Sequence, residues 1–394
     1  MKRIGIYGGA FNPPHIGHVQ GAKYALSALE MERLLVIPSY VSPHKAAPEN
    51  SPSAQQRLEM AQRAFGGEER ITVSDLELQR GGTSYTYETV EQVRSLYSEE
   101  EIVLLMGTDM FLSFHRWKEP ERILKNASLG VMYRGERREK EEILKRKEEF
   151  EAQGATVYLV ENPVVEISST DLRRMLIFRC ADEFISPEVM EYIQMNNLYG
   201  TGKNLRHLSE EKLREAVCSL LDPKRVPHVL GCRDAAVELA KIWGADETDA
   251  ARAGLLHDIT KALGGRLQLA LCWSYGAEID EFSIRNPKIL HALTGSLVAQ
   301  RIFGESLEVV DAIRTHTAGE AGMNILQKII YVADYMEPNR DFDGVEELRY
   351  LAHTDIDKAL KKGLTWATDI LRQQGREISP QSLAAMEELT RYGV

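Results

Sequence analysis

The stretch "RIGIYGGAFNPPHIGHVQGAKYALSALEM", residues 3–31, joins a short apolar run, a turn rich in glycine and proline, and a helical pattern. The run ends at Gly8 and Gly9, and the turn holds His15 and His18, three residues apart. Glycines at a strand-to-helix junction permit positive φ and close approach of backbone N–H groups to a ligand. At the start of a helix the two imidazoles share one face, where the helix dipole also favours an anion. The stretch therefore predicts a strand–turn–helix that binds phosphate.

Similar alternation continues to about residue 200 and predicts a doubly wound α/β fold with a parallel sheet. A highly charged segment over 134–154 is expected to form one solvated helix. Further apolar runs indicate strands, and amphipathic runs between them indicate helices: "RLLVIPS", "ITVSDLEL", "EIVLLMGTD" and "ATVYLVE" for strands, "SAQQRLEMAQRAF" and "YTYETVEQVRSLYS" for helices.

Beyond residue 200 the strand signals nearly vanish and long helical patterns replace them, for example "DAAVELAKIWG" and "QKIIYVADYM". A Gly-Thr-Gly run at 200–202 is a plausible linker. A chain of 394 residues also exceeds the size of about 250–300 residues at which single cores stop growing. We therefore expect an α/β domain over 1–200 and an all-α domain over 205–394.

The composition favours a cytoplasmic enzyme that acts on small molecules. A net charge of −11 disfavours nucleic acid as a partner, because such binding rests on a basic surface. The four cysteines form no CxxC pair, which suits a reducing compartment. No signal peptide and no long apolar run are visible, so we expect no membrane association. The oligomeric state is not readable from the sequence.

Basic and hydroxyl side chains follow several of the expected strands of the first domain. Lys45 ends "SPHK", Arg134 follows "VMY", and Arg173 ends "ISSTDLR", whose serines Ser168 and Ser169 are suited to cap a helix. Residues at the carboxyl ends of parallel strands converge on one crevice. Together with the two histidines, these residues predict a triphosphate site.

These motifs resemble those of the nicotinate-nucleotide adenylyltransferases over essentially all of residues 1–200. The family's HxGH signature is present as "HIGH" and its ISSTxxR signature as "ISSTDLR". One departure is Ala10 with Asn12, where many relatives have Ser or Thr and Asp. Companion stretches also correspond: "VIPSYVSPHK", "RLEMAQRAF", "GGTSYTYETV", "MGTDMFLSFHRWKEPERIL" and "VMEYIQMNNLY".

The resemblance implies transfer of AMP from ATP, with Mg²⁺, to nicotinate mononucleotide, giving deamido-NAD and pyrophosphate in NAD biosynthesis. It implies that His15 and His18 contact ATP phosphates, with His18 the main catalytic residue. The implied substrate contacts are Gly8, Gly9, Lys45, Thr83, Asp109 on a ribose, Trp117 on the pyridine ring, Arg134, Ser168, Ser169 and Arg173. A sister enzyme with another acceptor, such as phosphopantetheine, remains an alternative, and nicotinate is not distinguished from nicotinamide by any single residue.

The helical half contains six histidines, four of which accompany carboxylates. The doublet His257-Asp258 ends the apolar pattern "AARAGLLHD", which places polar groups in the interior. Burying so many polar groups is costly unless something coordinates them, and imidazole with carboxylate is a ligand set for Zn, Mn or Fe. The pattern therefore predicts a metal site, whose candidate ligands are His228, His257, Asp258, His291, His316 and Asp334.

This pattern resembles the HD superfamily of metal-dependent phosphohydrolases, and more narrowly the bacterial enzymes that cleave diadenosine tetraphosphate symmetrically into two ADP. The matching stretches are "HVLGCRDAAVELA", "AGLLHDITK", "HALTGSLVA", "IRTHTAG" and "KIIYVADYMEPNRDFDGVEELR". The resemblance implies one metal at His228, His257, Asp258 and Asp334, a second at His291 and His316, and Asp258 as a catalytic, bridging carboxylate. It suggests iron, although manganese and zinc also suit the ligands.

Arg340 and Arg349 are candidate phosphate contacts, and His207 and His353 are expected to be structural. Two alternatives stay open for this half. It is a hydrolase of another nucleotide or pyrophosphate, or a non-catalytic module that binds nucleotides. The intact ligand set argues against the second alternative.

Overall fold

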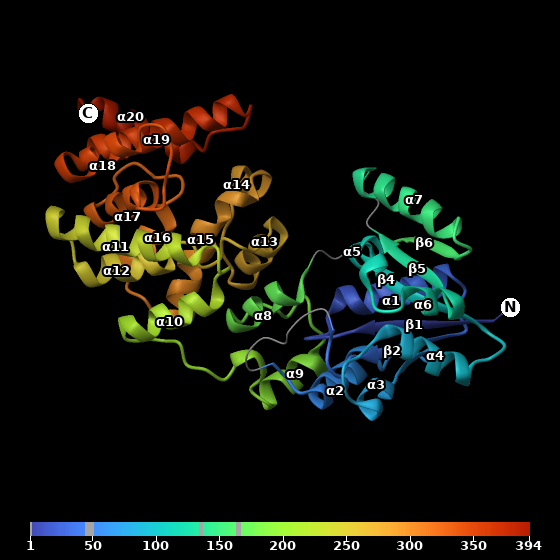
Figure 1. The fold of residues 1–394 in the computed structure, drawn as a ribbon. Helices are drawn as coiled ribbons and strands as arrows, with labels where there is room; N and C mark the ends of the chain where they lie inside the picture. Colours follow the sequence, from blue (N-terminus) through green and yellow to red (C-terminus); the bar gives the residue numbers. More distant parts are fainter. Residues whose placement is uncertain (1, 44–50, 134–136, 163–166) are drawn as a thin grey trace. The chain divides into compact units, whose positions relative to one another are not determined.

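The computed structural model describes residues 2–43, 51–133, 137–162 and 167–394. The chain divides into two compact units, Met1–Gly202 and Lys203–Val394 (Figure 1). Among the helices in these ranges, none is both long and apolar enough to cross a bilayer. Each unit has a separate architecture.

The first unit is built on a six-stranded parallel sheet in the order β3-β2-β1-β4-β5-β6, which confirms the predicted doubly wound α/β fold. Ile6 of the central strand β1 pairs with Leu35 of β2 on one side and with Leu104 of β4 on the other. From β1 the strand order runs one way to β2 and β3 and the other way to β4, β5 and β6, so the order reverses between β1 and β4, which in such sheets is where ligands bind. The strands are β1 (Arg3–Gly9), β2 (Arg33–Pro38), β3 (Ile71–Val73), β4 (Glu101–Gly107), β5 (Ser128–Tyr133) and β6 (Val157–Glu161).

Helices cover both faces of this sheet because alternate strand residues point to opposite sides. Ile102 and Leu104 of β4 join one core, and Val103 and Leu105 join the other. The helices are α1 (Ile16–Ala28), α2 (Ala54–Phe65), α3 (Leu76–Arg80), α4 (Thr86–Leu96), α5 (Thr108–Leu112), η1 (Phe114–Arg116), α6 (Pro120–Asn126), α7 (Arg137–Glu151), α8 (Ser169–Ile177), α9 (Pro187–Met195) and η2 (Leu198–Gly200). Residues of α1 and α2 pack on one face, and residues of α4, α5, α6 and α7 pack on the other.

Two local expectations differ from the structure. The run "ITVSDLEL" is a strand only over Ile71–Val73, after which Leu76–Arg80 forms α3. The charged helix α7 is not fully solvated, since Ile143 and Phe150 are buried in the sheet core. Apolar residues seven positions apart lie on one helix face, so this face packs while the charges remain outside.

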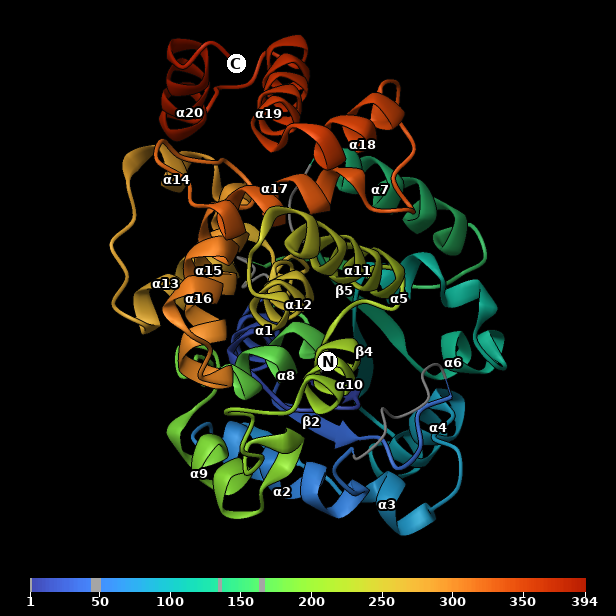
Figure 2. The ribbon, with the colours of Figure 1, turned by 90° about the vertical axis from the view of Figure 1, so that its left-hand side faces the viewer.

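The second unit is all helical, as predicted. Its central helix α17 (Ile325–Met336) is buried over most of its length and packs against α11 (Val226–Trp243), α12 (Glu247–Leu256), α16 (Leu307–Thr315) and α19 (Ile356–Gln373) (Figure 2). The remaining helices are α10 (Glu210–Leu220), α13 (Gly265–Ser274), α14 (Glu281–Arg285), η3 (Pro287–Ile289), α15 (Leu290–Val298), the π-helical η4 (Ala299–Phe303), α18 (Val345–Thr354) and α20 (Pro380–Arg391).

Candidate functional site

His15 and His18 lie side by side at the N-terminus of α1, beyond the carboxyl end of β1. His15 is the N-cap residue, and its backbone N–H donates to His18 Nδ1 at 3.3 Å. The two ring centroids are 3.7 Å apart, and the rings are tilted by 36°. Among the described residues, the buried Nδ1 of His15 finds no hydrogen-bond partner. The structure thus places the two histidines side by side and leaves at least one ring nitrogen, His15 Nδ1, without a hydrogen-bond partner among the described residues.

Both imidazoles are neutral in the absence of a ligand. Burial lowers the pKa of His15 to about 4. Burial, together with the neighbouring His15, also holds the pKa of His18 well below its usual range. A phosphate beside the rings would favour their protonated form. The pair can therefore meet an anion first as neutral hydrogen-bonding groups and then gain positive charge.

The backbone conformation of Gly8 and Gly9 differs from the one expected for this turn. Neither Gly8 nor Gly9 has positive φ, and the left-handed residue of the turn is Phe11, at φ 46°. A Cβ added at Gly8 would meet no atom within 4 Å, whereas one at Gly9 would lie 3.3 Å from the Phe11 ring. The expectation of positive φ was wrong. Among the described residues nothing occupies the space above Gly8, which leaves its backbone open to a ligand.

Long-range hydrogen bonds hold the backbone of the turn. Arg173 donates to Asn12 O at 2.9 Å, which places the "ISSTDLR" arginine against the histidine turn. Arg57 of α2 donates to Ala10 O and to Tyr40 O, each at 2.9 Å. The Tyr199 hydroxyl donates to Asn12 Oδ1 at 2.8 Å, inside the protein. Segments from both ends of the unit therefore fix the same turn.

The serines of "ISSTDLR" begin α8. Ser168 is its N-cap, and its Oγ accepts from Asp171 N at 3.1 Å. Ser169 is the first helical residue and is half-buried. An exposed helix N-terminus with small hydroxyl side chains is suited to bind phosphate.

The remaining predicted substrate contacts lie beyond other strands of the sheet. Asp109 is exposed in the first turn of α5, directly after β4. Thr83 is exposed beside Val41, with which it forms an isolated bridge. Lys45 and Arg134 fall outside the described residues.

Trp117 lines a cavity of about 200 Å³ together with aromatic and basic side chains. Lys118 Nζ lies 3.8 Å from the centroid of the Tyr85 ring in the same cavity. The other lining residues are Pro43, Thr86 and Arg116. An aromatic wall beside positive charge is suited to a planar, negatively charged ring system.

In the second unit, the six predicted ligands form one buried cluster. His228 Nε2 lies 3.3 Å from His257 Nε2 and 3.2 Å from Asp334 Oδ1. Asp258 is fully buried between two histidine pairs. Its Oδ2 lies 3.6 Å from His228 Nε2 and 3.5 Å from His257 Nε2, and its Oδ1 lies 3.5 Å from His291 Nε2 and 3.6 Å from His316 Nε2. The two oxygens of one carboxylate therefore face different pairs of imidazoles.

The other nitrogen of each imidazole has an acceptor that orients the ring. Nδ1 of His257, His291 and His316 lies 2.8, 2.6 and 2.6 Å from the carbonyl oxygens of Gly254, Lys288 and Ile313. His228 Nδ1 instead faces Glu337 Oε1 at 3.1 Å. An acceptor at Nδ1 fixes the tautomer that leaves Nε2 free, which is the usual support of a metal-binding histidine.

These residues fit divalent metal ions. Asp258 Oδ1 is buried and makes no hydrogen bond within the described structure, which a coordinated cation would satisfy. Burial raises the pKa of Asp258, but His257 and the other nearby histidines more than offset this, and the net pKa lies well below its usual range. The carboxylate is therefore ionised and ready to coordinate. Three or more of these donors lie within 4.8 Å of one another in two overlapping groups, His228, His257, Asp334 and His257, Asp258, His316.

Positively charged side chains surround the cluster. Arg225 Nε donates to Asp258 Oδ2 at 2.7 Å, and Lys261 Nζ lies 2.6 Å from His291 Nε2. Arg340 donates to Asp334 O at 2.7 Å, whereas Arg349 donates to the carbonyl oxygens of Met336, Glu337 and Arg340 and so supports the loop after α17.

His207 and His353 lie outside the cluster. The His207 ring packs against Gly304, where an added Cβ would approach it to 2.9 Å. His353 Nε2 lies 2.9 Å from Glu238 Oε1. Both contacts are structural in kind.

Several residues at these sites were not singled out in the sequence. Tyr199, Arg57 and Glu337 lie within the motif stretches. Their roles become visible only in the structure, where each makes a hydrogen bond to a residue far away in the sequence.

Lys261 also lies within a quoted stretch, "AGLLHDITK", in the turn after α12, where its backbone N–H donates to Asp258 O at 3.0 Å. Thr317 lies in the quoted stretch "IRTHTAG", directly after His316, and its Oγ1 lies 2.9 Å from His291 Nε2. Arg225 carried no signal, because it precedes the first matching stretch of the second unit.

Comparison with known proteins finds a different family model in each unit. The family model "Cytidylyltransferase-like" matches residues 6–175, and the model "HD domain" matches residues 225–339. A probable nicotinate-nucleotide adenylyltransferase of Borreliella burgdorferi is 31% identical over 198 residues, which are 50% of this chain and 96% of that protein.

For the second unit, a symmetrical bis(5'-nucleosyl)-tetraphosphatase of Bacillus subtilis is 34% identical over 176 residues, which are 44% of this chain and 94% of that protein. A crystal structure from Clostridium acetobutylicum, described as a predicted HD superfamily hydrolase involved in NAD metabolism, is 36% identical. It covers 47% of this chain and 98% of its own, with a TM-score of 0.46.

The first match covers 96% of the relative at 31% identity, and it falls on the unit that holds the parallel sheet and the histidine turn. The second unit has the HD doublet at the centre of a buried histidine and aspartate cluster. The chain therefore belongs to the nicotinate-nucleotide adenylyltransferase family through its first unit and carries an HD hydrolase domain, of a kind that binds divalent metal, in its second.

Proposed function

We propose that the first unit transfers AMP from MgATP to nicotinate mononucleotide, giving deamido-NAD and pyrophosphate. One observation carries this proposal: His15, which is buried, and His18, which is half-buried, lie side by side at a helix N-terminus, and Arg173 donates to a backbone carbonyl of the same turn. Such a site neutralises phosphate charge, which is the main requirement of phosphoryl-type transfer.

In this mechanism the protein supplies no nucleophile. A phosphate oxygen of the mononucleotide attacks the α-phosphorus of ATP, and the bond to the β-phosphate oxygen breaks as pyrophosphate leaves. We assign His15 and His18 to the ATP phosphates, with Gly8 allowing close approach. Lys45, Arg134, Ser168, Ser169 and Arg173 are proposed to stabilise charge on the leaving group, Asp109 to bind a ribose, and Thr83 and Trp117 to hold the acceptor.

The test is product analysis by mass spectrometry with ATP and a panel of acceptors that includes nicotinate, nicotinamide and phosphopantetheine compounds. We expect deamido-NAD as the main product. His18→Ala should keep the fold and lower turnover by about 10²-fold or more, because it removes a contact made in the transition state. Near-normal turnover in this variant, or preference for an acceptor that is not a pyridine mononucleotide, would contradict the assignment.

We propose that the second unit cleaves diadenosine tetraphosphate symmetrically into two ADP. The convergence of four Nε2 atoms on Asp258 and Asp334 carries this proposal. His228, His257 and Asp334 would hold one metal and His291 and His316 a second, with Asp258 between them. When bound, such a pair neutralises phosphate charge and activates water for in-line attack. Iron, manganese and zinc all suit the ligands.

In that reaction the oxygen of water bonds to one of the two central phosphorus atoms, and the bond from that phosphorus to the central bridging oxygen breaks. The bridging oxygen leaves as a terminal phosphate oxygen of the other ADP, and the protons of the attacking water pass to the solvent. Arg225 and Lys261 border the cluster and would bind the phosphate chain. The experiment is hydrolysis in ¹⁸O-labelled water with iron, manganese or zinc added. We expect two ADP per substrate molecule, one of which carries a single ¹⁸O atom. Formation of ATP and AMP, or no cleavage with any metal, would contradict the proposal.

A further inference from the structure

Arg57 of α2 carries its charge inside the first unit and joins two loops. Its side chain belongs to a residue that is only 8% exposed. Nη1 donates to the carbonyl oxygen of Ala10 and Nη2 to that of Tyr40, each at 2.9 Å. The guanidinium is planar, so its two donors form a rigid fork. One side chain therefore holds the two loops at a set distance from each other.

The two loops belong to different halves of the proposed reaction. Ala10 lies in the turn that ends at His15, where ATP is assigned. Tyr40 lies in the loop after β2, and Pro43 of that loop lines the cavity of about 200 Å³ beside Trp117. This cavity is assigned to the acceptor and is called the acceptor cavity. Arg57 thus connects the ATP side of the site with the acceptor side.

A second set of hydrogen bonds joins the loop after β2 to the start of α4. Tyr40 N donates to Ser84 Oγ, and Ser84 N donates to Val41 O, each at 2.9 Å. Tyr85 and Thr86 follow directly, and both line the acceptor cavity. A displacement of the loop would therefore move two walls of the acceptor cavity together.

Glu77 of α3 fixes the same segment from the interior. It is 6% exposed and accepts a hydrogen bond from Thr89 Oγ1 of α4 at 2.5 Å. Burial raises the pKa of Glu77, and hydrogen bonds from Ser84 and Thr89 offset this only in part. Burial also lowers the pKa of Arg57, and the nearby Tyr199 and Glu77 offset this in part. A buried polar network therefore extends from the histidine turn to α4.

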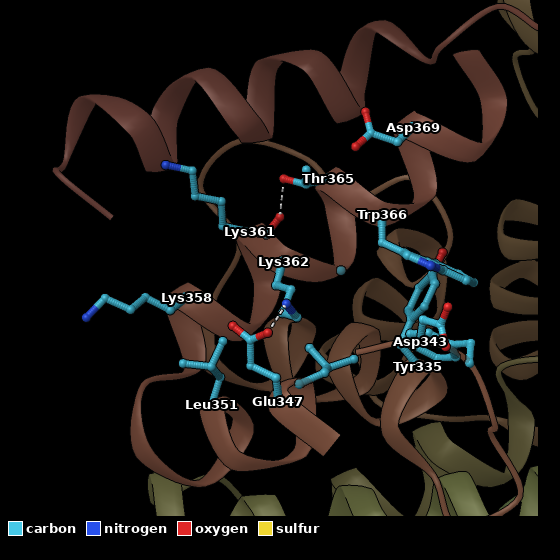
Figure 3. A pocket seen from close by; sticks show the side chains of 13 residues that line it. Tyr335, Asp343, Glu347, Leu351, Lys358, Lys361, Lys362, Thr365, Trp366 and Asp369 are labelled. Carbon is cyan, nitrogen blue, oxygen red and sulfur yellow. Dashed lines mark hydrogen bonds and ion pairs between the residues drawn. The ribbon is translucent and has the colours of Figure 1, made fainter. Parts of the chain in front are cut away.

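A cavity of about 430 Å³ in the second unit provides a contrast with this network (Figure 3). There, Lys362 pairs with Glu347 at 2.6 Å, and Lys358 pairs with Asp355 at 2.9 Å. All four side chains are partly exposed to solvent, and such ion pairs contribute little because water and salt screen them. Water screens Arg57 much less, so its two hydrogen bonds are suited to transmit a displacement from one loop to the other.

We propose that Arg57 is a positioning residue that couples the two halves of the adenylyltransferase site, so that each substrate tightens the binding of the other. This inference rests on the proposed adenylyl transfer and deepens it. A polyphosphate that orders the histidine turn also orders the loop after β2 through the fork of Arg57. The acceptor then binds to a cavity whose walls are already in place. Because coupling between two ligands is reciprocal, the acceptor must tighten ATP binding by the same factor.

The experiment measures the Kd of nicotinate mononucleotide for the full chain with Mg²⁺, by calorimetry, with and without saturating α,β-methylene-ATP. The methylene bridge of this analogue prevents transfer of AMP. The unaltered protein should bind the mononucleotide about 5- to 150-fold more tightly when the analogue is present, which is the usual range for coupled sites. Arg57→Gln removes the fork and should lose most of this factor, while the Kd of each ligand measured alone changes little.

Arg63→Gln is the matched control, since Arg63 lies on the same helix with a side chain that is 40% exposed. It should keep the full coupling factor. If Arg57→Gln does not fold, Ser84→Ala removes the acceptor of Tyr40 N at the other end of the network and should also lose most of the coupling. A lower stability alone would not change the factor. Absence of coupling in the unaltered protein, or full coupling in both network variants, would overturn the role of Arg57.

Product analysis of the same preparations separates this inference from the proposed function. If deamido-NAD forms and the coupling factor does not depend on Arg57 or Ser84, the coupling role fails and the transferase assignment stands. If another acceptor of the panel reacts instead, the assignment to nicotinate mononucleotide fails. The coupling factor measured with that acceptor then decides whether the role of Arg57 stands.

Discussion

At the scale of single residues, the low pKa values of His15 and His18 predict that the protein takes up protons when ATP binds. Burial lowers the pKa of His15 to about 4 and holds that of His18 well below its usual range, so both rings are neutral at pH 7 without ligand. Bound polyphosphate raises these pKa values, so ATP binding should take up protons and tighten as the pH falls toward 6. Calorimetry in buffers of different ionisation enthalpy measures the uptake. Uptake that is zero, or unchanged in His15→Asn and His18→Asn, would contradict this account.

Tyr199 supports the second residue-scale prediction. Its hydroxyl makes a buried hydrogen bond to Asn12, 187 positions earlier in the chain. Tyr199→Phe removes that bond and little else, so we expect a loss of about 1 kcal/mol in unfolding free energy. The KM for ATP should rise several-fold, because the turn is less well positioned. Tyr24→Phe, at an exposed tyrosine of the same unit, is the control. An unchanged KM together with lower stability would mean that Tyr199 is only structural.

At the scale of elements, the hydrophobic pattern and the motif spacing predicted most of the helices and strands, but not which residues far apart in the sequence contact one another. The alternating patterns give the parallel sheet, and the HD doublet gives the centre of the metal cluster, because burial of such residues needs a coordinating partner. The run after Val73 misled because Glu77 is buried in α3 and accepts a hydrogen bond from Thr89. In the sequence, a buried glutamate whose carboxylate accepts a hydrogen bond cannot be distinguished from a glutamate on the surface. Likewise, no local pattern shows that the φ-positive residue is Phe11 rather than a glycine.

Helix α17 carries a metal-site prediction of its own, because it presents Asp334 and is followed at its C-cap by Glu337. Glu337 is 1% exposed and orients His228 through Nδ1. Glu337→Gln should weaken metal binding by about 10- to 100-fold, the usual cost of losing such an orienting partner. Metal affinity measured by chelator competition tests this, with Glu308→Gln on α16 as an exposed control. Unchanged metal affinity in Glu337→Gln would show that the carboxylate does not support the site.

At the scale of the whole molecule, two cores of similar size predict two separate unfolding transitions, each controlled by one ligand. Met1–Gly202 and Lys203–Val394 each form a compact unit, and the two proposed sites lie in different units. A ligand at 100 times its Kd stabilises the unit that binds it by about 2.7 kcal/mol, which shifts the Tm of a unit of this size by roughly 5–10 °C. In calorimetry of the full chain, ATP should raise one Tm and Mn²⁺ the other, and a chelator should reverse only the second shift. His18→Ala should abolish the ATP shift alone, and His257→Ala the Mn²⁺ shift alone. A single transition that both ligands raise together would mean that the two units unfold as one, and would contradict the independence of the two cores.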